Sequence, residues 1–92
     1  MDTKQAFGNA LRMVRKQRRI TQEDFSEVSS RTYLSSLERG IKNPTIDKVV
    51  ELSGVLGVHP LTLLCIALAE AEGAQPEAVL SRVEKELQGI EL

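Results

Sequence analysis

The stretch TQEDFSEVSSRTYLSSLERG, which runs from Thr21 to Gly40, decides the fold of this chain. Thr21 can cap a short helix, and the acidic residues in the next turn suit the positive end of that helix. The serine pair in the middle of the stretch offers a new cap, so a further helix is expected from Arg31 to about Arg39. Gly40 can take the left-handed conformation that ends a helix. The stretch therefore predicts two short helices with a tight break between them.

Upstream of this stretch, the sequence predicts a helix from Thr3, its expected cap, to about Gln17. Its apolar stripe, at helical spacing, consists of Phe7, Ala10, Leu11 and Val14. The opposite side is basic and carries Arg12, Arg15, Lys16 and Arg19. This helix is expected to have one core face and one charged face.

Downstream, the sequence predicts three further helices. The first is capped by Thr45 and ended by Gly57, and its expected inward residues are Ile46, Val49, Val50, Leu52 and Leu56. Pro60 opens the second, which ends at Gly73, and Pro76 opens the third.

Length and composition favour one helical domain. The chain has 92 residues, of which 41% are apolar and 27% are charged, a balance typical of a globular domain. Only 3% are aromatic and there is no Trp, so the core must consist of Leu, Val, Ile and Ala. We expect an all-α fold, with five helices in a domain of residues 1–72 and an additional C-terminal helix in residues 73–92.

The sequence also bears on the compartment. Cys65 is the only cysteine, so no intramolecular disulfide can form. We interpret it as a small buried hydrophobic residue, with a redox thiol or an intersubunit disulfide as the alternative. The apolar run of residues 63–68 is far shorter than the roughly 20 residues that span a bilayer, and the N-terminus lacks a secretory pattern. We expect a cytoplasmic protein that has no membrane span.

Charge is divided unequally along the chain. Residues 1–48 hold ten Lys or Arg against six Asp or Glu, whereas residues 49–92 hold two against seven, so the net charges are +4 and −5. A basic first half can meet a polyanion while the acidic second half faces solvent or another protein. Two ordinary solvated surfaces are the alternative.

The two helices of the opening stretch form a helix-turn-helix unit, whose second helix lies in the major groove of DNA. At 100° per residue, one side of this helix gathers Tyr33, Leu34 and Leu37. The other side carries the polar residues Arg31, Thr32, Ser35 and Ser36. Arg can give two hydrogen bonds to guanine, and Thr can bond a base or touch a thymine methyl group. The polar side is therefore the expected reading surface.

Several motifs resemble the phage-repressor, or XRE, family of helix-turn-helix proteins. They are Thr21-Gln22-Glu23-Asp24-Phe25, Tyr33-Leu34-Ser35-Ser36-Leu37-Glu38-Arg39-Gly40, Asn43-Pro44-Thr45 and Leu56-Gly57-Val58. The similarity covers about residues 7–64, and the order Glu-Arg-Gly then Asn-Pro-Thr is quite specific. It implies a five-helix repressor-like fold and a transcriptional regulator that binds double-stranded DNA.

The resemblance also implies roles for individual residues. The implied base contacts are Arg31, Thr32 and Ser36. The implied phosphate contacts are Gln22, Arg39, Lys42 and Asn43. Two features depart from the family: the segment from Gln22 to Glu38 is shorter than the common spacing, and His59 stands where a Ser, Thr or Asp cap is usual. The shorter segment leaves the angle of the reading helix open.

Each implied contact also has a plainer interpretation. Arg31 and Thr32 can be solvated residues of a first helical turn, and the glutamine before them can be an ordinary helix residue. Arg39 can instead brace the fold by pairing with Glu38 or Glu51. The basic side of the first helix can be a solvated surface, although we expect at least one of its residues to reach a phosphate.

Catalytic and metal chemistry have no candidate residues. His59 is the only histidine, and no second ligand lies near it in the sequence. There is no Ser-His-acid set, no Gly-rich phosphate loop and no paired-carboxylate cleft. We expect no enzymatic activity, no cofactor and no metal site.

The segment after Gly57 carries two apolar stripes. They are Leu61, Leu64 and Leu68 in one helix, and Leu80, Val83 and Leu87 in the next, at heptad-like spacing. The stripes can pack on each other within one subunit, but we expect them to form a homodimer interface, which suits a palindromic DNA site. An antitoxin-like or adaptor module that holds a protein partner through the acidic C-terminal helices is the alternative function.

Overall fold

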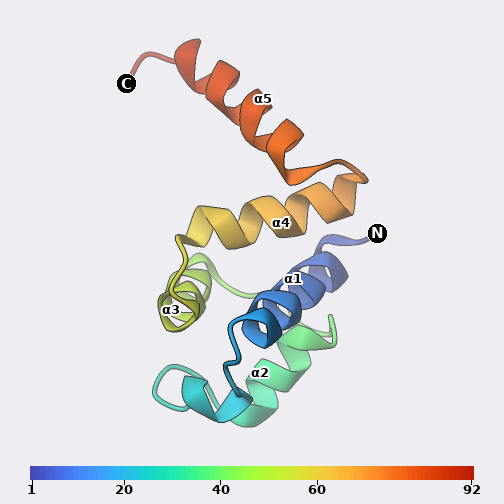
Figure 1. Ribbon diagram of the computed structural model, residues 1–92, viewed down its shortest axis with the longest axis vertical. Coiled ribbons are helices and arrows are strands. Elements are labelled where there is room, and N and C mark those ends of the chain that lie inside the picture. The colour runs from blue at the N-terminus through green and yellow to red at the C-terminus, as the bar shows by residue number, and fades with distance from the viewer.

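The computed structural model describes residues 1–92. Its elements are α1 (Thr3–Gln17), the 3-10 helix η1 (Gln22–Phe25), α2 (Arg31–Glu38), α3 (Ile46–Leu56), α4 (Pro60–Glu72) and α5 (Pro76–Gln88). There is no strand, so the expected all-α class is confirmed. Figure 1 shows α4 lying across α1, α2 on the other side of α1, α3 beside α1 and against α4, and α5 extending away from them.

The helix ends follow the predicted caps with one exception. The hydroxyl of Thr45 accepts the Lys48 N–H at the start of α3, and Gly57 ends that helix in the left-handed region at φ 74°. At α1, however, the cap is Asp2 rather than Thr3: its carboxylate accepts the Gln5 N–H at 2.8 Å. A carboxylate at this position also carries the negative charge that the positive helix end favours.

The second predicted helix is only one 3-10 turn. Asp24 reaches back to accept the Thr21 N–H at 2.8 Å, which completes a capping box around η1. Phe25 is fully buried, and its carbonyl accepts the N–H groups of Val28 and Ser29. The anchored Phe25 thus turns the chain toward α2 within a few residues.

The core is mostly aliphatic but also contains both phenylalanines and no isoleucine, unlike the expected Leu, Val, Ile and Ala, and it joins all the elements except α5. Its twelve residues are Phe7, Ala10, Leu11, Val14, Phe25, Leu34, Leu37, Val49, Leu52, Leu56, Leu63 and Ala67. Gly8 allows α1 and α2 to touch backbone to backbone, because a Cβ at this position would lie 2.4 Å from the Leu37 carbonyl oxygen. The position of α2 is therefore fixed both by its buried leucines and by this close approach.

Two residues of α3 differ from expectation. Ile46 is 82% exposed and Val50 is 50% exposed, although both were expected to face inward. The helix meets the core mainly along Val49, Leu52 and Leu56, at steps of three and four residues. Val50 is turned about 100° from Val49, and Ile46 lies in the first turn at the edge of the contact.

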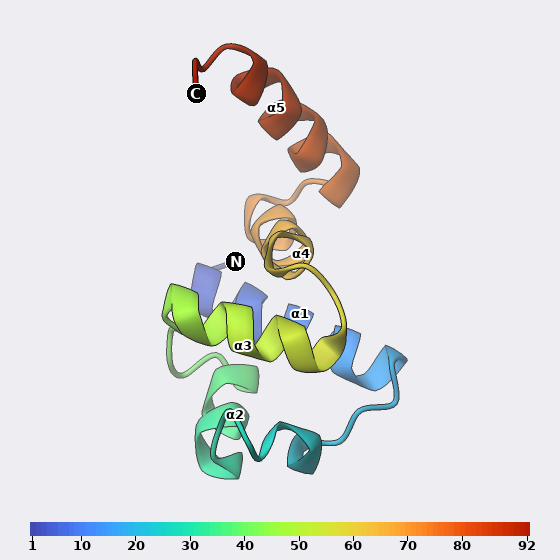
Figure 2. The ribbon, with the colours of Figure 1, turned by 90° about the vertical axis from the view of Figure 1, so that its left-hand side faces the viewer.

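The last helix, α5, packs against α4 and buries none of its residues. Both views show it running away from the rest of the molecule (Figures 1 and 2).

No single helix is long and apolar enough to cross a bilayer. The pair α3 and α4 meets the length and composition only when the two are taken together, across a 108° bend.

Candidate nucleic-acid interface

A polar, basic surface surrounds Gln22 at the junction of α1, η1 and α2. Beside α2 it forms a shallow depression lined by Gln22, Arg31, Thr32, Ser35 and Arg39. Adjoining depressions extend it over α1 and add Arg12, Lys16 and Arg19. Five exposed cations thus gather around one glutamine, which suits a phosphate backbone rather than a small neutral ligand.

The first turn of α2 presents Arg31 and Thr32 to solvent. Ser30 caps this turn by accepting the Tyr33 N–H at 3.1 Å, and the fully buried Leu34 holds the opposite side of the helix. Arg31 lies 3.6 Å from the Glu23 carboxylate, but both side chains are more than 70% exposed. An ion pair of this kind contributes little, so Arg31 is available to another partner.

Ser36 does not lie on the exposed face. It is only 8% exposed, and its hydroxyl donates to the Thr32 carbonyl at 3.0 Å. The sequence expectation that placed it on the exposed polar side is wrong, because the buried part of α2 extends past Tyr33 to include Ser36. Ser35 instead lines the depression beside α2.

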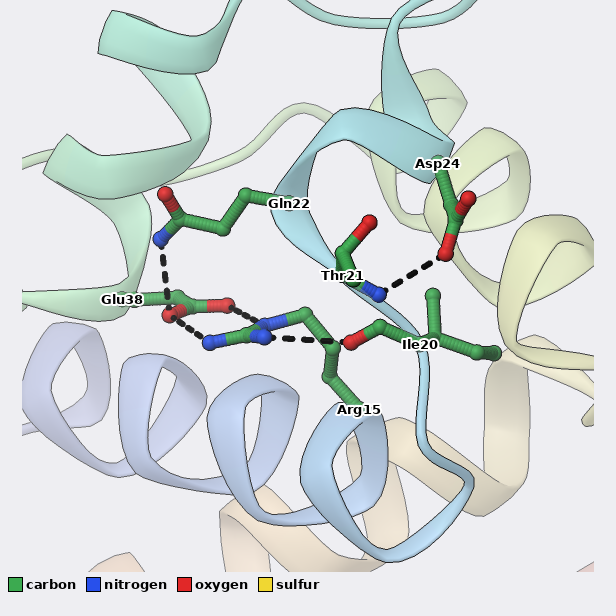
Figure 3. A network of polar contacts seen from close by, with 6 residues as sticks. All are labelled: Arg15, Ile20, Thr21, Gln22, Asp24 and Glu38. Carbon is green, nitrogen blue, oxygen red and sulfur yellow. Dashed lines mark hydrogen bonds and ion pairs between the residues drawn. The ribbon is translucent and has the colours of Figure 1, made fainter.

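A buried ion pair lies directly behind Gln22 (Figure 3). Arg15 donates from Nε to Glu38 Oε2 at 2.6 Å and from Nη2 to Oε1 at 3.0 Å. Its third group, Nη1, donates to the Ile20 carbonyl at 3.1 Å, and Gln22 Nε2 donates to Glu38 Oε1 at 3.2 Å. The hydrogen bond to Glu38 raises the pKa of Arg15 against the opposing effect of burial.

This network changes the roles expected for three charged residues. Arg15 belongs to the interior rather than to the free basic side of α1, because its side chain is only 12% exposed. Glu38 takes Arg15 as its ion-pair partner, so Arg39 is not needed to neutralise it. Arg39 is exposed and donates only to the Ser35 carbonyl of its own helix, at 3.4 Å.

The loop after α2 carries the exposed residues Lys42 and Asn43. The Lys42 ammonium lies 5.7 Å from the centre of the Tyr33 ring, within the range of a cation–π contact. Lys48 lies 5.9 Å from the same ring, pairs with Glu51 at 3.0 Å, and also donates to the Val28 carbonyl. The Tyr33 ring therefore lies near the ammonium groups of both Lys42 and Lys48 at this edge of the surface.

The residues expected at a dimer interface divide into two groups. Leu64 packs against the core, whereas the exposed ones are Leu61 (67%), Leu68 (40%), Leu80 (52%), Val83 (41%) and Leu87 (52%). Between α4 and α5 lies a groove of about 420 Å³. Cys65 lines it, half-buried, and its thiol donates to the Pro76 carbonyl at 3.3 Å. Cys65 is therefore not the core residue that was expected.

Sequence reasoning placed Ser35 on the polar side of α2 without assigning it a contact, and it missed Glu38 as the centre of the network. The sequence indicated Glu38 only as part of the Leu-Glu-Arg-Gly run and as a possible partner of Arg39. A carboxylate between a buried leucine and an exposed arginine, with a basic helix upstream, was the available signal. No group of three or more His, Cys, Asp or Glu residues is arranged to hold a metal ion.

A one-turn helix, a tight break and an exposed polar helix end on a basic surface define a helix-turn-helix DNA-binding protein. The helix-turn-helix family model matches residues 11–63, more than half of the chain. The chain therefore belongs to the helix-turn-helix family of XRE type, whose members are transcriptional regulators and not enzymes.

Two relatives agree with this membership. The HTH-type transcriptional regulator y4dJ of Sinorhizobium fredii is 39% identical over 66 residues, which cover 70% of this chain and 86% of the relative. Control protein C.BamHI of Bacillus amyloliquefaciens is 38% identical over 61 residues, which cover 63% of this chain and 75% of the relative. The similarity thus extends over most of each relative.

Proposed function

We propose that this regulator binds one preferred double-stranded DNA sequence in the cytoplasm, as a homodimer on a palindromic site with α2 of each subunit in a major groove. The observation that carries the proposal is the exposed N-terminal turn of α2, with Arg31 and Thr32 free and Leu34 anchored in the core. In helix-turn-helix proteins this end of the second helix meets the base edges.

We assign base contacts to Arg31 and Thr32, and to Ser35 in place of the buried Ser36. Arg31 suits the two acceptors of guanine, and Thr32 suits a base edge or a thymine methyl group. Phosphate contacts are assigned to the surrounding residues, which are Gln22, Arg39, Lys42 and Asn43. Arg12, Lys16 and Arg19 extend the same charge along α1, so their contribution is electrostatic and independent of sequence.

The dimer is assigned to α4 and α5. The apolar side of α5 carries Leu80, Val83 and Leu87, and Ile90 follows the helix end; all four are between 41% and 56% exposed. An isolated helix of 13 residues is marginal in water, and most helix stability in proteins comes from burial of an apolar face. A second copy would bury this face and set two α2 helices about 34 Å apart, one turn of DNA. The alternative occupant is an unrelated protein held as by an adaptor.

The test is selection of bound duplexes from a random pool, followed by titration of the full chain with the selected duplex and with a scrambled one. We expect the selected duplex to bind about 1,000-fold more tightly. Affinity for both should fall steeply as salt is added, because phosphate contacts release counterions. Equal affinity for all sequences would reject the proposal of sequence-specific binding.

A further inference from the structure

We propose that Glu38, neutralised by Arg15, is a positioning residue that holds the Gln22 side chain in the orientation required to contact a DNA phosphate. This inference rests on the proposed phosphate contact of Gln22 and goes one step further. It assigns a task to a buried ion pair that touches no DNA itself.

Glu38 sets the orientation of the Gln22 side-chain amide. Glu38 Oε1 accepts a hydrogen bond from Gln22 Nε2 at 3.2 Å, and an ionised carboxylate can only accept hydrogen bonds. The amide nitrogen must therefore face Glu38, and the amide cannot turn over without placing two acceptors together. One N–H of the same Nε2 group remains free, and it is the donor that a phosphate oxygen needs.

Glu38 is itself held in one position. It is 9% exposed, and the Arg15 guanidinium fixes both of its oxygens, at 2.6 and 3.0 Å. Arg15 also donates to the Ile20 carbonyl, which lies two residues before Gln22. The backbone leading to Gln22 and the partner of its side chain are therefore held by the same guanidinium (Figure 3).

Arg15 also neutralises the negative charge of Glu38. Without Arg15, the carboxylate would be a negative charge one hydrogen bond away from a group that approaches phosphate, and it would repel DNA. The bidentate pair removes this repulsion while keeping the acceptor. A glutamine already held in one conformation loses less freedom when DNA binds, so the contact contributes more to affinity.

The test is a double-mutant cycle on binding to the selected duplex. Gln22→Ala is measured in the wild type and in Arg15→Met/Glu38→Met, which removes both charges together and leaves neither buried and unpaired. We expect Gln22→Ala to weaken binding about tenfold in the wild type and less than about twofold in the double variant. Circular dichroism and thermal melting check that the double variant is folded.

Lys42→Ala supplies the matched control, because Lys42 lies on the loop after α2 and makes no contact with Gln22. In that background Gln22→Ala should keep its full tenfold effect. A full effect of Gln22→Ala in Arg15→Met/Glu38→Met overturns the positioning role while leaving the phosphate contact intact. No effect in the wild type overturns the phosphate contact itself and the positioning role with it.

A second measurement needs no variant. In the free wild-type chain, ¹⁵N relaxation of the Gln22 side-chain amide should show restricted motion, whereas the exposed glutamines Gln17 and Gln88 should move freely. Motion of Gln22 as free as that of Gln17 and Gln88 overturns the inference, even if the double variant fails to fold.

Discussion

The helices of residues 1–72 and the helix α5 differ in how far their apolar side chains are buried. From α1 to α4 most leucines meet in one core, although Leu61 and Leu68 of α4 stay exposed, and five exposed basic residues gather on the outer surface around Gln22. In α5 no residue is buried, and the leucines stand in solvent beside acidic residues. The first region is complete as a single chain. The second gains from a partner, which is why we assign DNA contact to one and assembly to the other.

The sharpest contrast is expected from leucines removed on each side of this boundary. Leu37→Ala should lower the free energy of unfolding by about 2–5 kcal/mol, because Leu37 is fully buried and its loss leaves a cavity. Leu87→Ala should change the unfolding of the dilute chain by less than about 0.5 kcal/mol. Urea denaturation at low protein concentration measures both. A large loss from Leu87→Ala would mean that α5 belongs to the core.

Assembly is expected to depend on the same exposed residues of α5. Leu80→Ser/Leu87→Ser should raise the dimer dissociation constant by about 100-fold or more, because each dimer would lose the burial of four leucines. Ile46→Ser is the matched control, since Ile46 is 82% exposed but lies on α3. Sedimentation equilibrium at matched concentrations is the measurement. A wild-type chain that stays monomeric contradicts the assignment.

The preference of α2 for one DNA sequence is expected to depend on Arg31 and not on Arg19. Arg31→Ala should weaken binding to the selected duplex by about 1–3 kcal/mol while leaving binding to a scrambled duplex nearly unchanged, because only a base contact is lost. Arg19→Ala should instead weaken both duplexes similarly and reduce the salt dependence. Fluorescence titration at several salt concentrations separates the two. An equal loss on both duplexes from Arg31→Ala would make it a phosphate contact.

Two glycines provide the smallest and most local comparison. Gly54 of α3 has open space around its missing Cβ, so Gly54→Ala should stabilise the fold by about 0.5–1 kcal/mol through helix propensity. Gly8→Ala, with a Cβ 2.4 Å from the Leu37 carbonyl oxygen, should destabilise it despite the same gain. Thermal melting compares them. Stabilisation by both changes would show that α1 and α2 can move apart.

The helix boundaries were predictable because local chemistry sets them. Thr45, Gly57 and Pro76 each act on their own turn, so the sequence alone reveals where helices start and stop. The form of η1 was not predictable in the same way. This single 3-10 turn ends at Phe25, which is fully buried against residues distant in the chain, and tertiary packing of this kind overrides local propensity.

The candidate site was predictable in outline and not in its internal bonds. Arg31 and Thr32 follow from helical spacing, whereas Ser36 was misplaced because the buried arc of α2 is wider than its apolar residues suggest. The partner of Glu38 is 23 residues away in the sequence. Neither spacing nor composition indicates which of the two arginines on α1, Arg12 or Arg15, turns inward to meet it.

The exposed first turn of α2 also has a consequence for how such a regulator can acquire new targets. Its base-reading candidates, Arg31 and Thr32, are solvent-exposed, while Leu34 and Leu37 of the same helix carry the packing. Substitutions at the two outward positions therefore change little in folding stability. The proposed base contacts can therefore be exchanged one side chain at a time, without compensating changes elsewhere in the chain to restore folding stability.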